Sequence, residues 1–179
     1  MGDDTVNQMR RFIVICAALG TLAVSSAALA MQSAPGDGSL VVKNASALSG
    51  TAVVALTVTG TVWGHVGAGK IVIDDSTPND DSSPIVTGAG PSHAVPNSDT
   101  ALSWSGVDFK FRAVGGKYTV LIYGSGVDVV AFGSGHVTLA GVPDSPAGDG
   151  FYSLNGDPFR SLPGAPGKRL SIGTAVPIG

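Results

Sequence analysis

The stretch that most constrains this chain is residues 107–123, in which apolar and polar side chains alternate on both sides of Gly115-Gly116. Alternation with a period of two indicates β-strands with one buried face. A Gly-Gly pair allows positive φ at both central positions of a two-residue hairpin turn, and such a turn fixes the register of its strands. The register places six apolar side chains on one face, in the opposed pairs Ala113 and Tyr118, Phe111 and Val120, and Phe109 and Ile122. We therefore predict a hairpin whose aromatic face forms the centre of the core.

The composition favours an all-β fold for the whole chain. All thirteen acidic residues are Asp, Glu is absent, and the chain contains 26 Gly and 11 Pro. Asp, Gly and Pro favour turns, whereas the missing Glu is a good helix former. We expect an antiparallel β-sandwich of roughly ten short strands, preceded by an N-terminal signal helix. A short β-solenoid is the alternative, because glycines recur at matching places in residues 67–73 and 133–139, as they do at solenoid corners.

The N-terminal residues have the pattern of a secretory signal peptide. Arg10 and Arg11 precede an apolar run that ends in the small-residue pattern Ala28-Leu29-Ala30, after which we expect cleavage. An uncleaved anchor is the alternative, because the apolar run is of borderline length for a membrane span. The expected organisation is a signal peptide at 1–30, a linker at 31–38, a single β domain at 39–162 and a Pro/Gly-rich tail at 163–179.

Export and charge restrict the partners that we expect. The only cysteine, Cys16, lies in the predicted signal, so the exported part has no disulfide. The formal net charge of −3 gives no electrostatic attraction to nucleic acid or to an anionic membrane surface. We expect a secreted or cell-surface bacterial protein whose partner is an envelope or extracellular protein or a glycan. Contact with a membrane is expected only through an uncleaved signal.

An Asp-rich segment is the best candidate for a ligand site. Asp74, Asp75, Asp80 and Asp81 are close in the sequence, with Ser, Thr, Pro and Asn between them. Calcium takes several oxygen ligands in irregular geometry, which a carboxylate-lined loop can supply. The spacing does not fit an EF-hand loop, which requires a glycine and a glutamate at set positions. The sequence therefore favours a solvated, turn-forming loop and no cofactor, with a calcium site at these four aspartates as the alternative.

No motif indicates a catalytic site. The sequence has no G-x-S-x-G elbow, and His65, His93 and His136 are too widely spaced to indicate a zinc site. Asp108 and Asp128 are the only acidic residues inside apolar strands, and as a carboxylate pair they represent the hydrolase alternative. We therefore predict no catalytic residues.

Aromatic residues provide a candidate platform for a sugar or a peptide. The members are Trp63, Trp104, Tyr118, Tyr123 and Tyr152. The hairpin register places Tyr118 in the core and Tyr123 on the other face, so the platform is expected to be incomplete.

Three successive stretches, FKFRAVGGKYTV, GSGVDVVAFGSGHVTLAG and DGFYSLNGDPFRSLP, resemble a set of small exported β-proteins from high-GC Gram-positive bacteria. The resemblance covers part of the chain and implies export and an all-β fold, without an assigned activity or a site residue. The leading hypothesis is an exported non-enzymatic module that acts through its surface. A calcium- or carbohydrate-binding domain is the alternative, followed by a hydrolase with an unrecognised site.

Overall fold

Two long strands carry most of the fold, which is known here from a computed structural model. Strand β2 spans Val54–Asp75 with 22 residues, and β5 spans Ala101–Leu139 with 39 residues. The shorter strands are β1 (Gly38–Ala45), β3 (Ile85–Thr87), β4 (His93–Ala94), β6 (Phe151–Leu154), β7 (Arg160–Ser161) and β8 (Lys168–Ile172). The ladders between these strands are all antiparallel in the part of the chain that the structure describes, so the predicted all-β antiparallel class is confirmed.

The structure describes residues 37–47, 50–78, 83–142 and 150–173. These residues belong to the second of two compact units, Ser33–Gly179, whereas the first unit is Met1–Gln32. The predicted signal peptide and its helix therefore lie outside the described residues, as does most of the predicted linker. The described ranges contain no helix, and hence none with the length and apolar character needed to cross a membrane.

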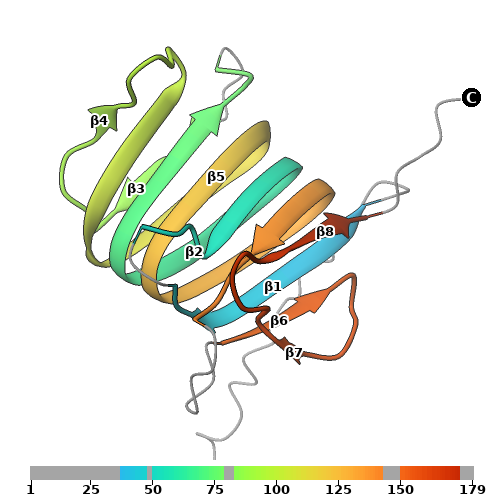
Figure 1. Cartoon of the computed structure of the whole chain (residues 1–179). Helices are drawn as coiled ribbons and strands as arrows, with labels where there is room; N and C mark the ends of the chain where they lie inside the picture. Colours follow the sequence, from blue (N-terminus) through green and yellow to red (C-terminus); the bar gives the residue numbers. More distant parts are fainter. Residues whose placement is uncertain (1–36, 48–49, 79–82, 143–149, 174–179) are drawn as a thin grey trace, which may run out of the picture. The chain divides into compact units, whose positions relative to one another are not determined.

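Strand β2 pairs with β5 along both of its edges. Val66 lies opposite Phe109 on one side and opposite Val127 on the other, two residues that are 18 positions apart in the sequence. Val58 likewise lies opposite both Tyr118 and Gly135. Because β5 passes β2 twice, the two strands wind around each other as an antiparallel two-stranded coil, whose repeated passes are visible in Figure 1.

Paired glycines form the bends of the coil. Gly60 lies opposite Gly133 with φ values of +146° and +134°, and Gly69 lies opposite Gly124 with φ values of +155° and +141°. A Cβ atom on Gly60 would lie 2.2 Å from the carbonyl oxygen of Phe132, and one on Gly69 would lie 2.0 Å from that of Tyr123. Only glycine combines this backbone conformation with so close an approach of the neighbouring strand.

The bends divide the coil into two layers. Layer A contains residues 61–66 of β2 and residues 107–114 and 127–132 of β5, together with β1, β3, β6 and β7. Layer B contains residues 54–59 and 70–75 of β2 and residues 101–105, 117–123 and 134–139 of β5, together with β4 and β8. One core cluster joins the inward side chains of the two layers.

The six apolar side chains predicted for the core are buried, but the predicted hairpin register is wrong. Phe109 and Tyr118 are fully buried and Phe111 is 3% exposed. Gly115-Gly116 lies inside β5, where Val114 is opposite Thr61 and Gly116 is opposite Gly60. Gly115, with φ of +81°, is the extra residue of a β-bulge. A one-residue bulge and a two-residue turn both leave the same side chains pointing inward before and after Gly115-Gly116. The buried face was therefore predicted correctly, although the strand partners were not.

The remaining fold predictions are met in part. The eight strands found among the described residues belong to a single sheet, whereas a sandwich consists of two separate sheets. Glycines recur at the bends of the coil, and this feature agrees with the solenoid alternative. Strands β6 and β7 pair as a hairpin, with Phe151 opposite Ser161 and Tyr152 opposite Arg160. Strand β8 lies within the segment expected to be a tail, so the sheet extends beyond Leu162.

Candidate functional site

Layer A carries an outward face centred on Trp63. Along this part of β2, Val62 and Val66 are fully buried, so the alternation of a strand turns Trp63 and His65 outward. Trp63 lies opposite exposed Arg112 on one side and partly buried Val130 on the other. We call the outward side chains of Trp63, Phe132, Arg112, His65 and Asp128 the Trp63 face.

An aromatic pair is the main feature of the Trp63 face. The rings of Trp63 and Phe132 are stacked, with centroids 5.6 Å apart and an interplanar angle of 28°. The coil brings them together, because Thr61 lies opposite Phe132 while Trp63 lies opposite Val130 in the same ladder. The two rings are therefore diagonal neighbours on adjacent strands, and both are partly exposed. The solvent-facing side of such a sheet is usually polar, which makes an aromatic pair there informative.

Charged and polar groups surround the aromatic pair. His65 lies opposite Lys110 on one side and Asp128 on the other, and its Nε2 is 2.7 Å from Oδ1 of Asp108. The Asp108 side chain is 84% exposed, and its residue has φ of +55°. Asp128 Oδ1 accepts a hydrogen bond of 2.8 Å from the backbone N–H of Asn44. The face thus combines aromatic surface with hydrogen-bonding groups of both charges.

The two aspartates of the hydrolase alternative lie on either side of His65. Asp108 contacts the imidazole directly, whereas Asp128 is its cross-strand neighbour and is held by the backbone of β1. Both carboxylates stand on the outer surface of a sheet. Such an arrangement can bind and orient polar groups of a ligand, whereas reaction sites usually lie in clefts.

The predicted calcium residues do not converge where the structure describes them. Asp74 points outward and accepts a hydrogen bond from the Thr100 hydroxyl, while Asp75 is 5% exposed and accepts one from the Thr77 N–H at 2.9 Å. Adjacent strand residues face opposite sides of the sheet, which separates the two carboxylates. Asp80 and Asp81 lie outside the described residues. Within the described ranges, no group of three or more His, Cys, Asp or Glu is placed to hold a metal ion.

The other predicted aromatic residues are dispersed. Tyr118 lies in the core, where its hydroxyl donates to the Val114 carbonyl at 3.1 Å, and Tyr152 is 6% exposed. Trp104 packs against the core, and Tyr123 lies opposite Lys70 on layer B. Phe132, the stacking partner of Trp63, was not among the predicted platform residues.

The other two histidines are separated from Trp63 by the fold. His136 lies opposite Thr57 and Ser171 on layer B, and His93 is exposed in β4.

Comparison with known proteins gives no relative from which a site could be transferred. The chain matches no family model, no curated protein and no solved structure.

Proposed function

We propose that this protein is an exported, non-enzymatic β-sheet module that binds a carbohydrate of the cell envelope or extracellular space through the Trp63 face. The observation that carries this proposal is the stacked pair of Trp63 and Phe132 on the outer surface of layer A. Export is supported by the signal-peptide pattern that ends at Ala30 and by the resemblance to small exported β-proteins.

The chemistry of the face suits a glycan. The C–H groups on one side of a sugar ring are apolar and pack on the flat surface of an aromatic ring, while its hydroxyls need donors and acceptors close by. Arg112 supplies donors, Asp128 supplies acceptors, and His65 with Asp108 supplies both kinds of group. A sheet surface also accommodates an extended polymer better than it encloses a small molecule.

Tryptophan fluorescence tests the proposal, because the chain contains two tryptophans. In the Trp104→Phe variant the emission reports on Trp63 alone, and titration with soluble cell-wall glycans should shift or quench it. Trp63→Ala should weaken binding by about tenfold, which corresponds to ~1.4 kcal/mol and is typical of one aromatic contact. Phe132→Ala should have a smaller effect in the same direction.

The control is Tyr123→Ala, which removes an outward aromatic residue from layer B and should leave glycan affinity unchanged. Circular dichroism of each variant verifies that the sheet is intact. The absence of any Trp63 response to cell-wall glycans would refute carbohydrate binding by this face.

A further inference from the structure

Strand β8 presents an open edge of the sheet. It pairs with residues 135–139 of β5, and no described residue forms a ladder with its other edge. The Ser171 carbonyl points away from β5, because it accepts a hydrogen bond of 3.4 Å from Asn155 Nδ2. Backbone groups alternate in direction along an antiparallel strand, so the N–H and C=O of Arg169 also point to the open edge, together with the Ser171 N–H.

The side chain of Asn155 occupies the first position along this edge. Its Oδ1 accepts hydrogen bonds from the N–H groups of Gly173, at 3.0 Å, and Ser39, at 3.3 Å. The amide thus substitutes for the backbone of a strand residue at the end of β6. The chain then turns back into β7, which pairs with β6 in layer A. The position beside β8 in layer B is left open by the described residues.

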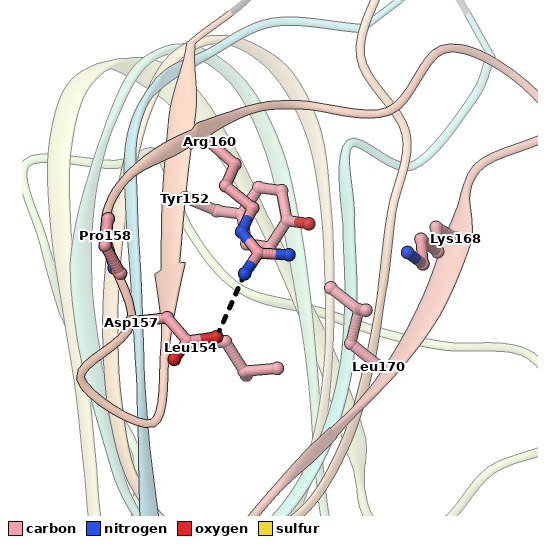
Figure 2. A pocket seen from close by; sticks show the side chains of 7 residues that line it. All are labelled: Tyr152, Leu154, Asp157, Pro158, Arg160, Lys168 and Leu170. Atoms are coloured by element: carbon pink, nitrogen blue, oxygen red, sulfur yellow. Dashed lines mark hydrogen bonds and ion pairs between the residues drawn. The ribbon is translucent and has the colours of Figure 1, made fainter.

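A small pocket lies next to the open edge, between β8 and the β6–β7 hairpin. Tyr152, Leu154 and Leu170 give it an apolar part, and Arg160 and Lys168 approach it from opposite sides (Figure 2). Its volume of about 50 Å³ is far below that of a typical small-molecule site. The pocket therefore fits one side chain of a longer ligand.

The charge around the edge indicates the kind of strand that fits. Arg160, Lys168 and Arg169 are exposed cations, and the nearby Asp157 is paired with Arg160 at 3.3 Å. A second copy of this chain joined edge to edge through β8 would bring the same cations together, which is unfavourable. An extended segment with acidic side chains is complementary.

We propose that the β8 edge binds an extended acidic segment of a partner protein, which adds as a strand beside β8 and places one side chain in the pocket. Backbone hydrogen bonds to Arg169 and Ser171 supply affinity, and the cations supply selectivity for acidic residues. This surface is separate from the Trp63 face, so variants of one surface leave binding at the other unchanged.

The test uses a capped, fluorescently labelled peptide of alternating Asp and Val, and a matched peptide of alternating Lys and Val. Fluorescence anisotropy should show binding of the acidic peptide only. The double variant Arg160→Glu, Lys168→Glu should weaken acidic-peptide binding by about tenfold or more and allow the basic peptide to bind.

A second pair of variants separates strand addition from charge attraction. Arg169→Ala removes one charge, whereas Arg169→Pro also removes the outward N–H, and proline is tolerated where that group faces solvent on an edge strand. Arg169→Pro should bind the acidic peptide about tenfold more weakly than Arg169→Ala. The Trp63→Ala variant should bind it normally.

Three results would overturn the proposal. Equal affinity of the Arg169→Pro and Arg169→Ala variants would exclude strand addition. Slow hydrogen exchange at Arg169 in the free monomer would show that another part of this chain occupies the edge. Concentration-dependent dimerisation that the double variant abolishes would assign the edge to a second copy.

Discussion

The glycine pairs at the bends give the sharpest stability prediction. Gly69→Ala adds a Cβ atom 2.0 Å from the Tyr123 carbonyl oxygen and 2.9 Å from the Cα of Gly124, at a residue with φ of +155°. A non-glycine residue in such a conformation costs about 1–3 kcal/mol. Relief of the contact must displace a neighbouring strand and lose ladder hydrogen bonds, at about 1 kcal/mol each. The variant should therefore lose about 3–5 kcal/mol, a large fraction of the ~5–15 kcal/mol typical of a domain.

Two matched substitutions separate the contributions. Gly115 has φ of +81° and open space around it, so Gly115→Ala should cost only about 1–2 kcal/mol for the left-handed backbone. At Gly90 the nearest atom to an added Cβ is the Ser105 carbonyl oxygen at 3.4 Å, and Gly90→Ala should change stability by less than ~0.5 kcal/mol.

The assay is equilibrium unfolding in urea, followed by far-ultraviolet circular dichroism. From most to least stable, the predicted order of the variants is Gly90→Ala, Gly115→Ala and Gly69→Ala. If Gly69→Ala does not fold, Gly67→Ala provides a milder test at the same bend, because its added Cβ would lie 3.1 Å from the Ser125 carbonyl oxygen. A Gly69→Ala variant as stable as Gly115→Ala would refute the close approach of β2 and β5 at this bend.

Two further predictions concern the core and the Asn155 bridge. Phe111→Ala should destabilise the fold by about 3–5 kcal/mol, because the ring is 3% exposed and packs where Gly64 lacks a side chain. Urea unfolding measures this loss, and a change below ~1 kcal/mol would place the ring outside the core. Asn155→Gly keeps the φ of +51° accessible but removes the amide that bonds Ser39, Ser171 and Gly173. Hydrogen exchange should then accelerate in residues 168–172 and remain unchanged at β2, whereas unchanged exchange in β8 would contradict the bridging role.

The inward faces of the strands could be predicted from the sequence, but their partners could not. The alternation from Phe109 to Ile122 identifies the buried side chains correctly whether Gly115-Gly116 is a turn or a bulge. Choosing between the two requires knowledge of the strand that lies opposite, and that strand, β2, is distant in sequence. Local patterns carry no information on such long-range pairing.

One signal of the coil was present in the sequence. Gly106, Gly115, Gly124 and Gly133 recur every nine residues, and Gly60 and Gly69 have the same spacing. Individually, these glycines also match the ends of short strands, so the nine-residue spacing is the only feature that points to the coil. The aromatic pair depends on the same geometry, because Phe132 reaches Trp63 only on the second pass of β5 along β2.

Both proposed surfaces depend on the double pairing of β2, and engineered disulfides test that pairing. In a Cys16→Ser background, Thr57→Cys is combined with Thr119→Cys or with His136→Cys, the residues opposite Thr57 on its two edges. Directly opposed strand residues lie within disulfide range, and the Thr57 and Thr119 hydroxyls are 3.4 Å apart. A third pair, Arg112→Cys with Thr119→Cys, would be opposed in a Gly115-Gly116 hairpin. Peptide mapping under non-reducing conditions should find both disulfides that involve position 57 and no disulfide between positions 112 and 119. Formation of the disulfide between positions 112 and 119, with loss of either disulfide at position 57, would contradict the coil.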